Sequence, residues 1–140
     1  MGLDPTGSAV LAQAAGSVIL LDTNALLWLQ SSHRRAGPLH RHAGSLYVSP
    51  VSLLEIQFLL EVGKVRLQPK ARMEELSADP RWLVDDPSSA GLFRAAQEVG
   101  WTRDPFDRLL VGHARLRGWR LATGDGDLLG RLRAEESLEL

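Results

Sequence analysis

The 140 residues, 44% of them hydrophobic, are enough for one domain with a single core. Because 16 Lys and Arg residues face 17 Asp and Glu residues, the net charge is -1, which argues against a protein that holds polyanions by bulk charge. The absence of cysteine excludes disulfides and thiolate metal sites, and no apolar run approaches the roughly 20 residues that span a bilayer, so we expect no membrane segment.

Residues 1–17 differ in composition from the rest, since Gly, Ser, Ala and Pro dominate there. A secretory signal is disfavoured because this stretch has no basic start and its short apolar part is interrupted by Gln13. We expect a flexible N-terminal extension, followed by one domain over residues 18–140.

The first predicted strand ends in a carboxylate. Val18–Leu21 is a continuous aliphatic run, which is typical of a strand buried on both faces of a parallel sheet. Asp22 follows at its C-terminal end, and Thr23 or Asn24 can cap the helix predicted to come next. In open α/β sheets ligands bind beyond the C-terminal ends of the strands, so Asp22 is the first candidate site residue.

The polar and basic stretch 31–44 favours a solvated surface. It carries three of the four histidines, without the spacing of a metal site: His33, His40 and His42. A short strand is predicted after it, over Leu46–Val48.

The next predicted helix carries a carboxylate on a mostly apolar surface. Ser49 can cap this helix and Pro50 suits its first position. We expect the helix to cover residues 51–62 and to stop at Gly63. Glu55 has apolar neighbours there, and a carboxylate in that setting is costly to bury unless it is paired or bound to a metal. Glu55 is the second candidate.

The third predicted strand, Trp82–Val84, ends in Asp85 and Asp86. Two carboxylates at a strand end are compatible with catalysis, but Asp86 before Pro87 is also an ordinary helix start. We expect Asp86 to cap the helix over residues 88–99.

The stretch Thr102–Leu110 supplies the third candidate. Asp104 is a good N-cap, because Pro105 then occupies the first helical position. Asp107 lies on the apolar side of the same helix. Capping accounts for Asp104 but leaves Asp107 unexplained.

The fourth candidate follows a strand predicted over residues 119–122. Thr123 and Asp125 come next and reach the same sheet edge as the first carboxylate, and we expect Asp127 to cap a last helical turn. The spacing of Asp125 and Asp127 resembles a calcium loop, but the rest of that ligand pattern is absent. Residues 137–140 can add an edge strand.

Strands and helices alternate along the whole chain, which predicts an α/β fold with a central, mostly parallel sheet and helices on both faces. The four candidate carboxylates can then converge at one end of the sheet. They would repel one another unless a cation neutralised them, and Mg²⁺ or Mn²⁺ prefers oxygen ligands. Such clusters serve phosphoryl chemistry.

Four motifs in series resemble the PIN domain, and especially the VapC-type toxins of bacterial toxin-antitoxin pairs. They cover about residues 18–140 in family-like order: Asp22-Thr23-Asn24 after an aliphatic strand, the helical Glu55, Asp104-Pro105-Phe106-Asp107-Arg108-Leu109-Leu110 and Thr123-Gly124-Asp125. The resemblance implies a metal-dependent endoribonuclease whose acidic quartet is Asp22, Glu55, Asp107 and Asp125.

The resemblance also implies supporting residues. Thr123 matches the polar helper near the fourth acid and Asn24 the polar position after the first, while Asp104 is assigned capping work beside the site. The chain departs from the family pattern at Gly124, where many members carry a bulkier, often basic residue.

We expect Asp22, Asp107 and Asp125 to hold Mg²⁺ or Mn²⁺, and Glu55 to orient or deprotonate the attacking water. The resemblance implies hydrolysis to a 5′-phosphate and a 3′-hydroxyl. The RNA would need local positive charge and a stacking surface, although each candidate is equally compatible with an ordinary surface role: Arg34, Arg35, Arg103, Arg108, Arg115 and Trp101.

The partners follow from the resemblance as well. VapC-type toxins are cytoplasmic, commonly form homodimers, and are silenced by an antitoxin whose tail fills the groove near the acids. The candidates for apolar contacts with such partners are equally compatible with the core: Trp28, Leu29, Phe58 and Leu59.

Two other classes stay open. A non-catalytic α/β binding module would use the acids only as helix caps, which leaves Glu55 and Asp107 unexplained. A phosphatase of the haloacid-dehalogenase type also places an aspartate after the first strand, but it needs an acid two residues on, where Asn24 stands. It also needs a lysine near the phosphate, and neither Lys64 nor Lys70 lies at a predicted strand end.

Overall fold

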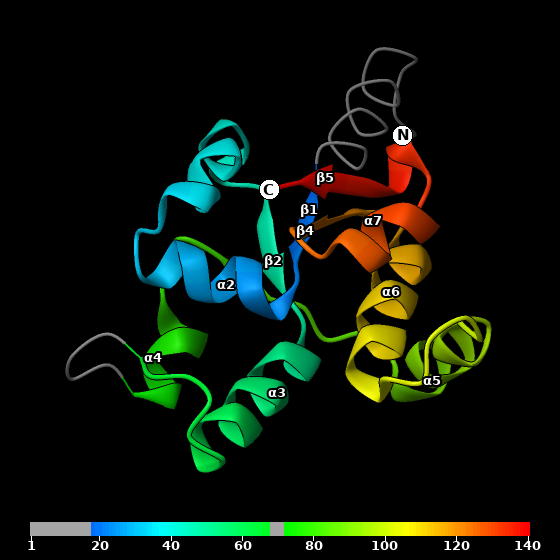
Figure 1. The fold of residues 1–140 in the computed structure, drawn as a ribbon, viewed down its shortest axis with the longest axis horizontal. Coiled ribbons are helices and arrows are strands. Elements are labelled where there is room, and N and C mark those ends of the chain that lie inside the picture. Colours follow the sequence, from blue (N-terminus) through cyan, green and yellow to red (C-terminus); the bar gives the residue numbers. More distant parts are fainter. Residues whose placement is uncertain (1–17, 68–71) are drawn as a thin grey trace, which may run out of the picture.

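The predicted parallel sheet is confirmed. A computed structural model describes residues 18–67 and 72–140, and within these ranges the strands form one five-stranded sheet in the order β3-β2-β1-β4-β5, with every neighbouring pair parallel (Figure 1). The strands are β1 (Ile19–Leu21), β2 (Leu46–Val48), β3 (Leu83–Val84), β4 (Arg120–Thr123) and β5 (Ser137–Glu139). The extension expected over residues 1–17 lies outside the described residues.

Helices cover both faces of the sheet, as expected for parallel strands joined by crossovers (Figure 1). One face carries α2 (Thr23–Gln30), the 3₁₀ helix η1 (Arg34–His42), α3 (Pro50–Glu61) and α4 (Met73–Ala78). The other carries α5 (Ser89–Gln97), α6 (Pro105–Arg117) and α7 (Gly126–Arg131), and η2 (Ala134–Glu136) precedes β5. No helix of the described residues has both the length and the apolar character needed to cross a membrane.

The continuous aliphatic run forms the central strand, β1, which is buried on both faces of the sheet. Successive side chains of a strand point to opposite faces, so Ile19 and Leu21 pack in the cluster under α2 and α3, while Leu20 packs under α6. All three are completely buried. The residue after this strand is therefore held at a fixed point between two layers of helices.

Among the predicted starts of α3, α5, α6 and α7, two are confirmed and two are wrong. Ser49 and Asp104 cap α3 and α6, each followed by proline. The cap of α5 is Ser88, whose hydroxyl accepts from Gly91 N, and the exposed Asp86 takes no part. The cap of α7 is Asp125, and Asp127, which was predicted to be the cap, lies in the first turn of the helix. In both helices the cap is the residue whose side chain reaches the free amides of the first turn. The positions of the polar residues in the sequence could not show which residue that would be.

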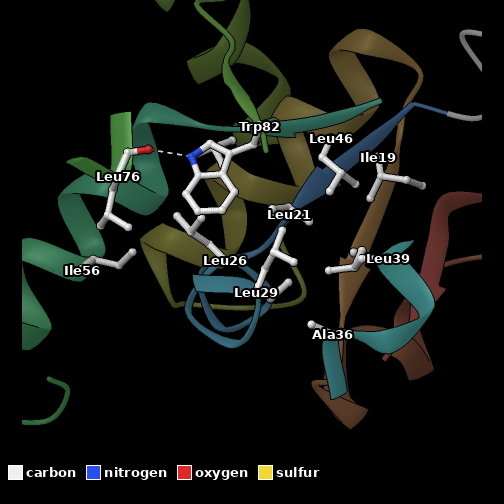
Figure 2. Packing of buried hydrophobic residues seen from close by; sticks show 13 residues of the cluster. Ile19, Leu21, Leu26, Leu29, Ala36, Leu39, Leu46, Ile56, Leu76 and Trp82 are labelled. Atoms are coloured by element: carbon white, nitrogen blue, oxygen red, sulfur yellow. Dashed lines mark hydrogen bonds between the residues drawn. The ribbon is translucent and has the colours of Figure 1, made fainter. Parts of the chain in front are cut away.

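Trp82 was predicted to begin a strand, but it is a core residue that precedes β3. Its side chain is 2% exposed, and its indole Nε1 donates a hydrogen bond of 2.6 Å to the carbonyl of Leu76 in α4 (Figure 2). The indole therefore attaches α4 to the sheet by packing and by one buried polar contact.

Replacing Trp82 with phenylalanine is expected to lower the free energy of unfolding by about 2 kcal/mol, because it removes buried volume and leaves the Leu76 carbonyl unpaired. Urea unfolding measures the change. Phe93→Leu, at an aromatic residue that is exposed on α5, is the control and should shift stability by at most about 0.5 kcal/mol. Equal stability of Trp82→Phe and the wild type would contradict this account.

Candidate active site

Asp22 is fixed by its own helix. It follows β1, is 4% exposed, and its Oδ1 accepts a 2.7 Å hydrogen bond from the amide of Ala25. The cap of α2 is thus Asp22, and not Thr23 or Asn24 as predicted. One oxygen of this buried carboxylate is committed to the cap.

Thr123 joins two of the acids. The register pairs Leu21 with Ala122, which places Asp22 beside the buried Thr123 at the end of β4. The Thr123 hydroxyl hydrogen-bonds the Asp22 carboxylate and accepts from the amide of Asp125 at 3.0 Å. Asp125 in turn caps α7 through its Oδ1. Parallel neighbouring strands therefore bring the first and fourth acids together.

Glu55 comes from the middle of α3 and is half-buried. The hydroxyl of Thr23, at the start of α2, donates to its Oε1 and also lies 3.2 Å from the buried Ser52 Oγ. This contact fixes one carboxylate oxygen of Glu55 against α2.

Asp107 lies in the first turn of α6 and is half-buried. Asp104 caps this helix by accepting from the amides of Phe106 at 2.9 Å and Asp107 at 3.4 Å. The capping predicted for Asp104 is confirmed, and the cap leaves the Asp107 side chain available to the sheet edge.

The four acids line one cavity of about 290 Å³. They reach it from the end of β1, from α3 and α6, and from the turn after β4, so the predicted convergence is confirmed in the geometry. The remaining lining residues are Thr23, Asn24, Leu59, Lys64, Val65, Leu110 and Leu128. Lys64 was not expected there, because it follows the Gly63 turn rather than a strand, and only the return of the chain after α3 brings it to the cavity.

Among the described residues that line the cavity, four are carboxylates and one, Lys64, is positively charged. Burial raises the pKa of Asp22 from 3.8 to about 6, and the charges of Glu55 and Asp125 add to this effect. Burial also raises the pKa of Asp107 from 3.8 to about 7, and the negative charge of Asp104 makes the next largest contribution. The pKa of Glu55 is raised for the same reasons. The cavity therefore favours either protons or a bound cation.

Comparison with known proteins assigns the family. The family model of the PIN domain matches residues 19–134. The chain belongs to the PIN domain family. The chain is similar in fold to a chain in the crystal structure of VapBC2 from Rickettsia felis bound to a DNA fragment from their promoter, with a TM-score of 0.58 and 20% sequence identity. That similarity covers 87% of this chain and 97% of the other. The comparison with curated proteins gave no match.

The donor set of this PIN domain fits a hard divalent ion, because the four carboxylates that line the cavity outnumber its one lysine and the pKa values of Asp22 and Asp107 are raised. Within the described residues, no three His, Asp or Glu side chains are arranged tightly enough to hold an ion as they stand. Two of the acids each have one oxygen engaged in a helix cap. The acids would have to move closer together to bind one ion.

The neighbours of Gly124 explain why this chain has glycine where the family pattern has a bulkier residue. A Cβ at this position would lie 2.7 Å from the Trp28 ring and would also collide with the Arg35 guanidinium. That guanidinium lies 4.2 Å from the Trp28 ring centroid and donates to the carbonyls of Gly124 at 3.4 Å and Leu140 at 3.0 Å. A basic group thus reaches the turn before Asp125 from η1 instead of from within the turn.

The residues suggested for RNA binding are mostly engaged elsewhere. Arg108 donates to the carbonyls of Ala96 and Gln97, and Arg115 pairs with Glu136 at 2.9 Å. None of the five arginines suggested for RNA binding is among the described residues that line the acidic cavity. The candidates for partner contacts also separate: Leu29 is buried, Trp28 lies under Arg35, Leu59 lines the cavity, and Phe58 is exposed.

A second polar cluster resembles a hydrolase triad but is structural. His113 Nδ1 lies 2.8 Å from Ser49 Oγ and its Nε2 lies 2.7 Å from Asp85 Oδ2, which also pairs with Arg117. Ser49 and His113 are both completely buried, so no substrate reaches the hydroxyl. Burial lowers the pKa of His113, which is consistent with a neutral ring that links α6 to the start of α3.

Proposed function

We propose that this PIN domain, over residues 18–140, is a metal-dependent endoribonuclease, the toxin of a VapC-type toxin-antitoxin pair that acts in the cytoplasm. The observation that carries the proposal is that Asp22, Glu55, Asp107 and Asp125, from four separate elements, line one cavity at the C-terminal edge of the sheet. The fold likeness to a chain of VapBC2 supports the toxin class.

In the proposed site Asp22, Asp107 and Asp125 would hold Mg²⁺ or Mn²⁺. A bound divalent ion lowers the pKa of water and offsets the charge that develops at the phosphate. The protein supplies the fixed positions of its ligands: Thr123 orients Asp22 and the turn before Asp125, and Asp104 begins the helix that carries Asp107.

Glu55 is the proposed general base. Thr23 holds one of its oxygens, which leaves the other free to orient water, and its raised pKa lies closer to neutrality than that of an ordinary glutamate. The oxygen of this water attacks phosphorus, Glu55 accepts the proton of the water, and the bond from phosphorus to the 3′-oxygen breaks. The departing 3′-oxygen takes up a proton from solvent. The products are a 5′-phosphate and a 3′-hydroxyl.

The test is cleavage of single-stranded RNA by the purified chain. We expect cleavage with Mg²⁺ or Mn²⁺, loss of cleavage with excess chelator, and return of cleavage when the ion is restored. End mapping should find 5′-phosphates. Equal cleavage in chelator would contradict the proposal, and calorimetry that detected no Mg²⁺ or Mn²⁺ binding would favour a non-catalytic module.

We propose that the chain forms a homodimer and, as a toxin, also binds an antitoxin. An apolar stripe along α3 supports the homodimer, because Leu54 and Phe58 of the helix and Val62 at its C-cap are 64%, 46% and 49% exposed at a spacing of four residues. Light scattering should report twice the mass of the chain for the wild type and a lower mass for Phe58→Asp. A monomeric wild type would contradict the homodimer.

A further inference from the structure

A second cavity opens beside the acidic one. It has a volume of about 460 Å³, lies between the loop before α6 and helix α7, and shares Asp107, Asp125 and Leu128 with the acidic cavity. Its volume falls in the range of small-ligand sites, about 300–1,000 Å³. A chain that passes the four acids would therefore enter this second cavity next.

Trp101 forms one wall of the second cavity. It is half-buried, because part of its indole packs on the core cluster beneath α6, and the remainder lines the cavity. A flat aromatic side chain that is anchored in this way is a stacking surface for a nucleic acid base.

Arg131, in the last turn of α7, provides the positive charge of the second cavity. In the described part of the chain Arg131 forms no ion pair, whereas Arg115 and Arg133 both pair with Glu136. Its guanidinium carbon lies 5.9 Å from the Trp101 ring centroid, compared with 4.2 Å for Arg35 over Trp28. The Arg131 contact is thus loose, and its charge is available to a phosphate.

The acids of the cavity favour a base or sugar near Asp127, in the first turn of α7 and away from Arg131 in the last turn. Asp127 lines the cavity together with the two shared acids, so a phosphate is repelled there, while a base amino group or a ribose hydroxyl can donate to its carboxylate. Trp101 and Leu128 are the apolar side chains of the lining. That small apolar area favours a nucleotide over the apolar tail of a protein partner.

We propose that the cavity bounded by Trp101 and Arg131 binds one nucleotide of single-stranded RNA beside the cleaved bond, with its base stacked on Trp101 and a phosphate paired with Arg131. The inference rests on the proposed ribonuclease function. It extends the binding site of the RNA substrate from the acidic cavity to the second cavity. Trp101 and Arg131 are binding residues in this proposal and take no part in the chemical step.

Steady-state cleavage of a labelled single-stranded RNA in Mg²⁺ tests the proposal. For Trp101→Leu we expect KM to rise about tenfold with kcat within about twofold, and for Trp101→Phe we expect near wild-type values, since a phenyl ring still stacks. Arg131→Gln should raise KM and reduce the slope of log KM against log salt by about 0.7, the contribution of one phosphate contact. Phe93→Leu and Arg94→Gln, at exposed residues of α5, are the matched controls.

A fluorescence titration checks binding apart from turnover. In an Asp22→Asn background, RNA should quench tryptophan emission, and Trp101→Phe should remove most of the quench while RNA binding persists by filter retention. Circular dichroism verifies that each variant is folded.

The possible failures are distinguishable. A wild type that cleaves RNA while Trp101→Leu and Arg131→Gln leave KM unchanged overturns the nucleotide site but not the ribonuclease. A wild type without metal-dependent cleavage overturns the proposed function, and the quench titration then decides the nucleotide site alone. Unchanged RNA quenching in Trp101→Phe overturns the nucleotide site, and lost binding of a protein partner in Trp101→Leu with unchanged KM would assign the cavity to that partner.

Discussion

Replacing Asp22 with asparagine is expected to reduce metal-dependent RNA cleavage by at least about 100-fold, the order of effect found when one electrostatic group of an active site is removed. Asparagine has nearly the same shape and can still accept the Ala25 amide, so α2 keeps its cap and the fold is retained. The loss would then come from the missing charge in the cavity. Initial cleavage rates in Mg²⁺ measure it.

The matched control for Asp22→Asn is Asp86→Asn, because Asp86 is an exposed aspartate outside the acidic cavity. Its cleavage rate should equal that of the wild type. If Asp22→Asn were folded and cleaved RNA at the wild-type rate, the proposed role of the acidic cavity would be wrong.

Without divalent ions, the protein is expected to lose stability as the pH rises from about pH 4 to about pH 8. The pKa values of Asp22 and Asp107 in the folded state are about 6 and about 7, against an ordinary value of 3.8. Between these values the folded state binds more protons than the unfolded state, so its stability falls as the protons are released. For Asp22 alone the shift from 3.8 to about 6 corresponds to about 3 kcal/mol.

Urea unfolding at several pH values, with and without Mg²⁺, measures this effect. His113 opposes it, because its lowered pKa favours folding as the pH rises toward neutrality, so the informative quantity is the difference between the wild type and Asp22→Asn. That variant should be more stable than the wild type at about pH 8 without metal, and Mg²⁺ should stabilise the wild type more than the variant. Parallel pH profiles for the two proteins would contradict the raised pKa of Asp22.

The convergence of the acids could be predicted because it depends on local signals and one topological rule. The aliphatic run before Asp22 and the strand before Asp125 each end in an acid, and parallel strands present their C-terminal ends at the same edge. Glu55 and Asp107 were found by the cost of placing a carboxylate among apolar neighbours. These signals lie within a few residues of each acid and do not require tertiary contacts.

Contacts between distant segments could not be predicted in the same way. Lys64 reaches the acidic cavity, and His113 meets Ser49, only because the chain returns after a helix. The caps of α2, α5 and α7 were assigned to the wrong neighbour because adjacent polar residues differ little in capping preference. The need for glycine at position 124 likewise depends on tertiary contacts, because Trp28 and Arg35 occupy the space that a Cβ would fill.

The helix caps also restrict which ion the proposed site can use. Oδ1 of Asp22 accepts the Ala25 amide, and Oδ1 of Asp125 accepts the amides of Asp127 and Leu128, so one oxygen of each carboxylate is engaged in a helix cap. Ca²⁺ commonly takes both oxygens of a carboxylate, and it would have to break a cap to do so. Mg²⁺ accepts single carboxylate oxygens and keeps several waters. In the proposed site, the bonds that begin α2 and α7 would therefore favour a small ion that keeps several of its waters.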